Sequence, residues 1–162
     1  MTPSRDVVTV QRLIPAPAAA IFDLLADPSR HAEIDGSGTV VAPRSAGSRR
    51  LGLGDQFGLS MRMGVGYSTR NVVVEFEPDR LIAWKTLAAE PLDKIVTGRL
   101  WRYELEPVDG GTIVRETWDI SREAPLSRPL VRRFMKAQTR MNMTRTLERI
   151  ESVVTAAGLG FA

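Results

Sequence analysis

The chain has 162 residues, of which 43% are hydrophobic and 25% charged, and its net charge of +3 is modest, so we expect one globular domain over residues 1–162. No apolar run reaches the roughly 18 residues of a membrane-spanning helix, and the N-terminus lacks the apolar core of a secretory signal, which predicts a cytoplasmic protein. The absence of cysteine excludes disulfides, thiol nucleophiles and cysteine metal sites.

The first part of the chain predicts a strand followed by two short helices. Residues Val7–Leu13 alternate loosely between apolar and polar side chains, as a strand does. Pro17 suits the first turn of a helix over Ala18–Ala26, and Asp27 can cap a second helix over Pro28–Glu33. These elements lead into a turn rich in glycine and serine.

A series of strands with short connections occupies the middle of the chain. The connections contain glycine, proline and aspartate, which favours an antiparallel meander over a parallel sheet with crossover helices. One amphipathic helix, about Pro125–Ala157, closes the chain and is the only element large enough to cover such a sheet. The predicted strands are Thr39–Ala42, Asp55–Met63, Gly66–Glu77, Leu81–Leu87, Gly98–Pro107 and Thr112–Ile120.

Alternation along these strands assigns side chains to the face beneath the helix. Arg70 shares its face with Val74, so we expect it to point inward as well. The aromatic and methionine side chains on this face are compatible with a plain core and with the wall of a ligand pocket. The predicted inward and ligand-binding side chains on the strands are Phe57, Leu59, Met61, Met63, Val74, Trp84, Trp101, Tyr103, Glu116 and Trp118.

Glu116 falls on the apolar side of its strand, where a carboxylate is costly unless it is paired, hydrogen-bonded or protonated. One interpretation is structural: an ion pair with Arg70, or a position at a solvated strand end. The other is functional: a polar anchor or a general acid whose pKa is raised by burial. The candidate catalytic residues are Glu116 as acid or base, with Tyr103 or Arg70 polarising a carbonyl group.

His31 is the only histidine, so a serine–histidine–aspartate triad could be built in one way only, and no nucleophile elbow supports it. One histidine without cysteine is also a poor basis for a metal site. We therefore expect His31 to be a surface or capping group near Glu33 and Asp35, and we expect no metal and no cofactor.

The terminal helix carries a cluster of basic residues with a single acid, Glu148, among them. A solvated helix face explains such a cluster most simply. The alternatives are contact with an anionic membrane, an acidic partner or nucleic acid, and nucleic acid is disfavoured because no aromatic residues interleave with the basic ones. The cluster comprises Arg128, Arg132, Arg133, Lys136, Arg140, Arg145 and Arg149.

The apolar residues of this helix form two stripes that point in different directions. Leu130, Phe134 and Met141 lie on one side, and a second stripe from Met143 to Val154 is centred well over 90° away. We therefore predict a bend, a break or a change of packing partner near Met141–Thr144. The half with Phe134 would then lie over the mouth of a cavity or on a partner subunit, so Phe134 and Met141 are also predicted ligand contacts.

Two segments of the sequence resemble the SRPBCC superfamily, which includes START-like lipid-binding domains and polyketide cyclase/dehydrase-like proteins. They are VTVQRLIPAPAAAIFDLLADPSRHAEIDGSGTV at residues 8–40 and VVVEFEPDRLIAWKT at residues 72–86. The resemblance implies an α+β helix-grip fold: a curved antiparallel sheet of about seven strands, two short helices and a long C-terminal helix over a hydrophobic cavity.

The resemblance favours binding or transport of a hydrophobic small molecule, such as a lipid, a polyketide or an aromatic compound. The alternatives are a polyketide cyclase or dehydrase that uses polar pocket residues, and an interaction or membrane-surface domain that uses the basic helix. We expect a monomer or a homodimer. No catalytic signature of the superfamily stands out, so the catalytic residues remain the three candidates named above.

Overall fold

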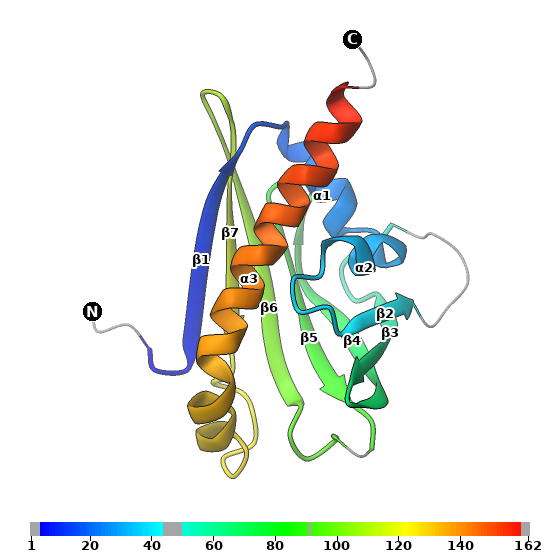
Figure 1. Cartoon of the computed structure of the whole chain (residues 1–162), viewed down its shortest axis with the longest axis vertical. Coiled ribbons are helices and arrows are strands. Elements are labelled where there is room, and N and C mark those ends of the chain that lie inside the picture. Colours follow the sequence, from blue (N-terminus) through cyan, green and yellow to red (C-terminus); the bar gives the residue numbers. More distant parts are fainter. Residues whose placement is uncertain (1–3, 44–49, 91, 160–162) are drawn as a thin grey trace.

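A seven-stranded antiparallel sheet forms the body of the molecule (Figure 1). The computed structural model describes residues 4–43, 50–90 and 92–159. The strand order is β1-β7-β6-β5-β4-β3-β2, so all strands except β1 neighbour the next one in sequence, which confirms the predicted meander. The strands are β1 (Val7–Ile14), β2 (Val40–Pro43), β3 (Gln56–Met63), β4 (Val65–Glu77), β5 (Leu81–Ala88), β6 (Thr97–Val108) and β7 (Gly111–Asp119).

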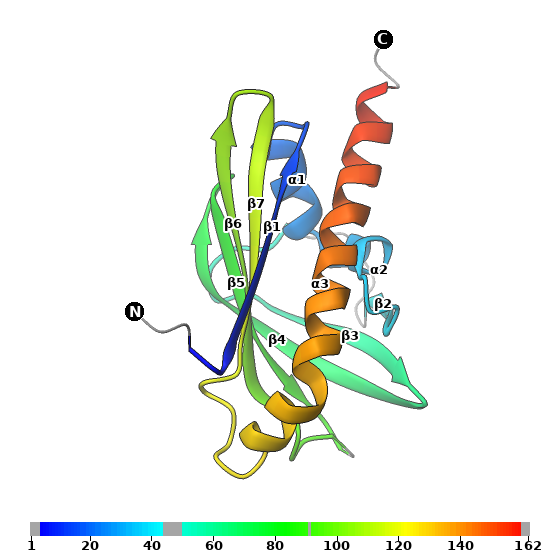
Figure 2. The ribbon, with the colours of Figure 1, turned by 60° about the vertical axis from the view of Figure 1, so that its left-hand side comes forward.

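All the helices lie on one face of this sheet, which curves around them (Figure 2). They are α1 (Ala18–Leu25), the short 3-10 helix η1 (Pro28–Arg30), α2 (His31–Ile34) and the long α3 (Arg128–Leu159). Asp27 caps η1 by accepting a hydrogen bond from the backbone N–H of Ser29, as its position before a proline predicts. This arrangement is the expected α+β helix-grip fold. Within the described ranges no helix is long and apolar enough to cross a membrane.

The long helix α3 runs without interruption from Arg128 to Leu159, so a break near Met141–Thr144 is wrong. The other predicted possibility, a change of packing partner, does occur there: Met143 packs in one buried cluster and Leu147 in the other. Only one of the two apolar stripes packs inward, whereas Leu130, Phe134 and Met141 are exposed to solvent. The inward stripe continues toward the N-terminus through smaller or partly polar side chains. The sequence-based prediction considered only the large apolar residues and therefore missed this part of the stripe. Its buried members are Val131, Thr139, Met143, Thr146, Leu147, Ile150 and Val154.

Helix α3 touches the sheet mainly at one margin. It packs against β1 and β7 on one side and against α1 and α2 on the other. One cluster of buried side chains joins the C-terminal half of α3 to α1 and the sheet, and a second cluster joins its N-terminal half to Val8, Trp118 and Ile120. Helix α1 packs against β6, whereas α3 itself lies along the margin of the sheet rather than over its middle strands.

Several basic residues of α3 attach the helix to the N-terminal segment. Arg132 forms an ion pair with Asp6 at 2.9 Å, and Arg128 lies 3.8 Å from the same carboxylate. Lys136 donates a hydrogen bond to the carbonyl oxygen of Arg5, and Arg140 donates one to that of Thr9. These contacts favour a structural interpretation of much of the basic cluster, because each fixes α3 against the edge strand β1 or the residues before it.

Strand β4 presents the opposite face to the one that alternation suggested. Its inward residues are Thr69, Asn71 and Val73, whereas Arg70 is exposed and Val74 is 42% exposed. The pairing register explains this, because Asn71 lies directly across from the inward Phe57 of β3, and opposed residues share a face. A shift in register between Val73 and Glu75 then turns Phe76 back toward the core.

The loop between α2 and β2 passes very close to α3 at Gly36. The backbone N–H of Gly36 donates to the Thr146 hydroxyl at 2.9 Å. A Cβ atom at this position would lie 2.1 Å from the carbonyl oxygen of Asn142, which is backbone and cannot swing aside. Only glycine fits this crossing.

Replacing Gly36 with alanine should therefore destabilise the protein by about 2–3 kcal/mol, because the helix and the loop must separate. Urea unfolding of the variant measures this change. Gly66→Ala is the matched control, since a Cβ atom there meets no atom within 4 Å. Equal stability of the two variants would contradict the assigned contact.

Candidate functional site

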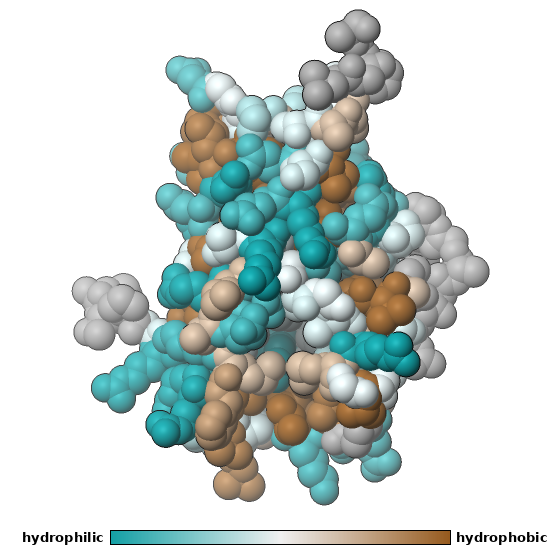
Figure 3. Space-filling view, viewed as in Figure 1, coloured by the Kyte–Doolittle hydropathy of each residue, from teal (hydrophilic) through white to brown (hydrophobic). Residues whose placement is uncertain are grey.

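A cavity of about 340 Å³ lies between α3 and the inner face of the sheet. The space-filling view shows the surface hollowed beside the lower half of α3 (Figure 3). Its wall is mostly apolar, and the side chains come from the sheet, the α2–β2 segment and α3. Of the residues predicted from sequence, those that line it are Leu59, Met61, Met63, Trp84, Trp101, Tyr103 and Glu116.

The other predicted site residues do not line this cavity. Phe57 and Trp118 are buried in the core on either side of it. Phe134 is 71% exposed and Met141 is 51% exposed, because the inward stripe of α3 runs along a different side of the helix. The remaining two, Val74 and Arg70, point away from the cavity for the register reason given above. Placing these residues around the cavity was wrong.

The register of β5, β6 and β7 arranges the side chains of the inner sheet face in rows, because directly paired residues share a face. Tyr103 of β6 lies between Ile82 of β5 and Glu116 of β7. The next row, two residues along each strand, is Trp84, Trp101 and Trp118, and the row after that pairs Thr86 with Arg99. The wall therefore runs from a carboxyl–phenol pair, past indole rings, to a guanidinium group.

Glu116 and Tyr103 form a buried hydrogen-bonded pair. The Tyr103 hydroxyl donates to Oε1 of Glu116 at 2.8 Å. Burial raises the pKa of Glu116 to about 8 although the hydrogen bond from Tyr103 opposes this, and burial together with the neighbouring Glu116 raises the pKa of Tyr103 well above its usual range. Arg70 gives Glu116 no ion pair, so that structural interpretation is wrong.

The second oxygen of Glu116 is without a partner. Within the described part of the chain, the buried side-chain atoms that make no hydrogen bond are Oε2 of Glu116 and Nε1 of Trp118. Since Tyr103 already donates to Oε1, the proton of the neutral carboxyl group belongs on Oε2. The pair thus presents an O–H donor for which these residues supply no acceptor. A buried donor of this kind is costly unless another molecule accepts from it.

His31 is buried rather than on the surface, which corrects the expectation from sequence. Its Nε2 lies 2.9 Å from the carbonyl oxygen of Leu25, which can only accept, so Nε2 carries the proton. The ring stacks on Trp84 with centroids 5.2 Å apart, and burial lowers the pKa of His31, which keeps it neutral. The spacing of His31 and Ile34, both inward on one short helix, was the available signal.

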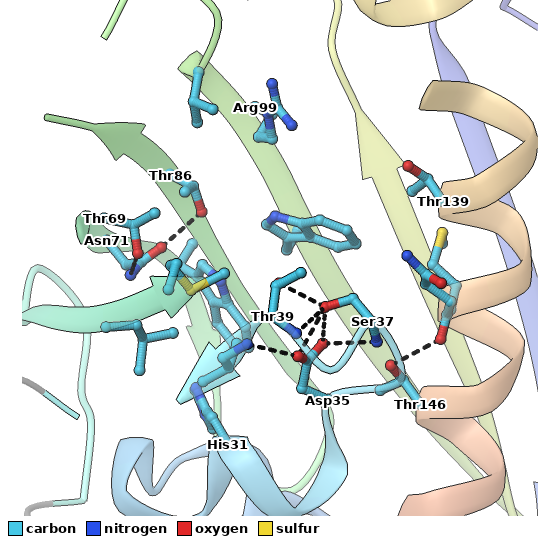
Figure 4. A pocket seen from close by; sticks show the side chains of 18 of the residues that line it. His31, Asp35, Ser37, Thr39, Thr69, Asn71, Thr86, Arg99, Thr139 and Thr146 are labelled. Atoms are coloured by element: carbon cyan, nitrogen blue, oxygen red, sulfur yellow. Dashed lines mark hydrogen bonds between the residues drawn. The ribbon is translucent and has the colours of Figure 1, made fainter. Parts of the chain in front are cut away.

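Two polar networks on the wall satisfy themselves (Figure 4). Thr86 donates to the side-chain oxygen of Asn71, whose amide nitrogen reaches the backbone of β3 and the Thr69 hydroxyl. The Asp35 carboxylate accepts from Ser37 and from the backbone N–H of Val40. Neither network has the composition of a metal centre, and no group of three or more metal-ligating side chains occurs in the described ranges.

Arg99, at the other end of the cavity from Glu116, forms a buried ion pair with Glu123. Nε of Arg99 donates to Oε1 of Glu123 at 2.7 Å, and the two side chains are 7% and 0% exposed. Sequence reasoning missed this pair. Alternation back from Trp101 would have placed Arg99 inward, but nothing marked Glu123, in the loop after β7, as its partner.

Comparison with known proteins places this chain in a wider group. A family model described as "Polyketide cyclase / dehydrase and lipid transport" matches residues 5–155. An uncharacterised protein of Mycobacterium tuberculosis is 36% identical over 108 residues, which is 65% of this chain. That match covers 44% of the relative, so the chain spans less than half the length of the curated relatives that it matches.

Solved structures with low sequence identity share the fold. A solution structure of a protein from Arthrobacter aurescens has a TM-score of 0.74 at 13% identity, covering 94% of this chain and 87% of that one. A crystal structure from Mycobacterium smegmatis has a TM-score of 0.72 at 15% identity, with 94% and 93% covered. A protein in the dynemicin biosynthetic locus has a TM-score of 0.65 at 14% identity, covering 94% of this chain and 48% of that one.

Proposed function

Because the chain belongs to the polyketide cyclase/dehydrase and lipid transport family of the SRPBCC superfamily, we propose that it binds a hydrophobic small molecule in the cavity beneath α3. The observation that carries this proposal is the unpartnered oxygen of Glu116 in a mostly apolar cavity. The volume of about 340 Å³ falls within the range of small-molecule sites. A ligand oxygen that accepts from Glu116 would satisfy the buried donor, and the indole rings would cover the apolar body of the ligand.

Filling the cavity should abolish binding without unfolding the protein. Thr139 faces the cavity from α3, and its hydroxyl makes no hydrogen bond to any described residue, so Thr139→Phe would place a ring in the space at little cost in hydrogen bonding. Native mass spectrometry of the purified wild type should show a bound small molecule, and the variant should lose it.

Met141→Phe adds a ring of the same size on the solvent side of the same helix and should keep the ligand. Retention of the ligand by the folded Thr139→Phe variant would count against the cavity as the binding site. Wild type that carries no ligand and takes up none of a panel of lipids and aromatic compounds would count against the proposal itself.

A second candidate function is acid–base catalysis on such a ligand, as in a cyclase or dehydrase. The observation that favours it is the pKa of Glu116 at about 8, since a carboxyl group near neutrality can both give and take a proton. We expect Glu116→Gln to lower turnover of a poly-β-keto substrate by about 10²-fold or more if Glu116 transfers the proton. Equal rates for wild type and variant would remove Glu116 from the mechanism and leave the binding proposal intact.

A further inference from the structure

Arg99 is the one cationic side chain on the wall of the cavity, counting the described residues only. A guanidinium group has five N–H donors. Nε–H is used by Glu123, and Nη2 donates to the carbonyl oxygen of Ile95 at 3.1 Å. Nη1 makes no hydrogen bond to any described residue. The buried Arg99 side chain therefore has N–H donors at the cavity wall that no described residue uses.

Glu123 is itself held in place, so it fixes Arg99 in one orientation. Oε2 of Glu123 accepts from the backbone N–H of Thr97 at 2.7 Å and from the hydroxyl of the same residue. That hydroxyl also accepts from the backbone N–H of Ala124. The loop after β7 is thus fastened to the start of β6, and the guanidinium plane has little freedom. Orientation of this kind lowers the entropic cost of binding a ligand.

The two ends of the cavity differ in chemistry and are well separated. Arg99 and Tyr103 lie four residues apart on β6, so their Cα atoms are about 13 Å apart at the usual rise of a strand. Trp101 lies between them, across from Trp84. Figure 4 likewise shows Arg99 at the opposite end of the pocket from His31, whose ring stacks on Trp84. An apolar middle thus joins the cationic end to the end that holds Glu116 and Tyr103, where the hydrogen-bonded Asp35 carboxylate also lies on the wall.

We propose that the ligand is an amphipathic carboxylic acid, with its carboxylate on Arg99 and its far end at Glu116 and Tyr103. This inference rests on the proposed function, because it assigns the two ends of the same cavity. A planar carboxylate can accept two parallel N–H bonds from the guanidinium group. At the far end, the ligand would offer an oxygen that accepts from Glu116.

The charge of Glu123 favours a singly charged ligand anion over a doubly charged one. Together Arg99 and Glu123 are neutral, so a ligand anion brings a net negative charge into a buried site. A doubly charged phosphate would carry twice that charge and would also need more donors than Nη1 and Nη2 offer. A singly charged carboxylate fits better, and its affinity gain should be moderate, at about tenfold over a matched alcohol.

Dodecanoate and dodecan-1-ol are suitable probes, because they share an alkyl chain and differ in the terminal group. Their affinities for the full chain can be measured by calorimetry at neutral pH. Wild type should bind dodecanoate about tenfold more tightly. The double variant Arg99→Gln with Glu123→Gln removes both charges together, keeps amide groups at both positions, and should bind the two probes equally.

The matched control is Arg102→Gln with Glu75→Gln. This ion pair of 3.1 Å involves the same strand β6 but is partly exposed and does not line the cavity, so the preference for dodecanoate should survive. Equal binding of the two probes by wild type would overturn the inference and leave the proposed function standing. So would a preference that persists in the Arg99/Glu123 variant. If wild type binds neither probe and carries no ligand in native mass spectrometry, the proposed function fails and this inference fails with it.

Discussion

Relative to Glu116→Gln, wild type should lose stability as the pH rises from about 5 to about 8. Burial raises the pKa of Glu116 from 4.5 to about 8 in the folded protein, whereas the unfolded chain has the ordinary value. Between these two pH values the unfolded state releases the proton and the folded state keeps it. Folding then requires proton uptake, so the free energy of unfolding falls with rising pH.

The expected size follows from the two pKa values. The difference between these pKa values lowers the free energy of unfolding by roughly 4–5 kcal/mol between acidic conditions and pH 8. Above pH 8 the contribution of Glu116 no longer changes. Glutamine resembles the protonated carboxyl group and does not titrate, so the variant should gain on wild type steadily over the interval. Urea unfolding at a series of pH values measures the difference between the two proteins.

Glu106→Gln is the matched control, because Glu106 is an exposed carboxylate on β6. Its difference from wild type should stay small at every pH. If the stability difference between Glu116→Gln and wild type is the same at pH 5 and pH 8, Glu116 does not remain protonated in the fold. The hydrogen-bond donor invoked for ligand binding would then be absent.

Alternation predicted well the stretches of strand whose pairing is regular, such as β5 with β6 from Leu81 to Thr86. The inward positions of β5, β6 and β7 follow period two, so Trp84, Tyr103 and Glu116 were all placed on the buried face. This is the part of the site that depends on local geometry alone. A polar residue among apolar ones on a half-buried strand stands out in the sequence, and that contrast pointed to Glu116.

The failures arose where non-local contacts decide. The face of β4 depends on its register with β3, and the shift near Val73 changes that face partway along the strand. The buried side of α3 depends on where the helix packs against β1 and β7. Thr139 therefore points inward, whereas the larger Phe134 is exposed. A list of hydrophobic residues contains neither piece of information.

The pairing of Arg99 with Glu123 could not be predicted from the sequence for a similar reason. Arg99 and Glu123 lie 24 residues apart, on a strand and in a loop. Only the closure of that loop onto the start of β6 brings them together. An arginine at the beginning of a predicted strand is otherwise most simply a solvated residue.

Breaking this ion pair on one side should be among the most damaging single changes in the protein. Arg99→Leu leaves the Glu123 carboxylate buried without its cation, and we expect a loss of about 3–5 kcal/mol in the free energy of unfolding. Arg99→Gln combined with Glu123→Gln removes both charges, and amides can still meet the N–H and hydroxyl of Thr97, so most of the loss should be recovered.

Urea unfolding of wild type, of the single variants Arg99→Gln and Glu123→Gln, and of the double variant forms a complete cycle. A double variant as unstable as the sum of the two single ones would mean that the groups act independently, which their 2.7 Å contact contradicts. Recovery of stability in the double variant would show that each charge is required to neutralise the other and that the fold itself does not require either of them. If neutral side chains support the fold as well as the ion pair does, stability does not explain the charges. Binding of the ligand by Arg99 would then explain them.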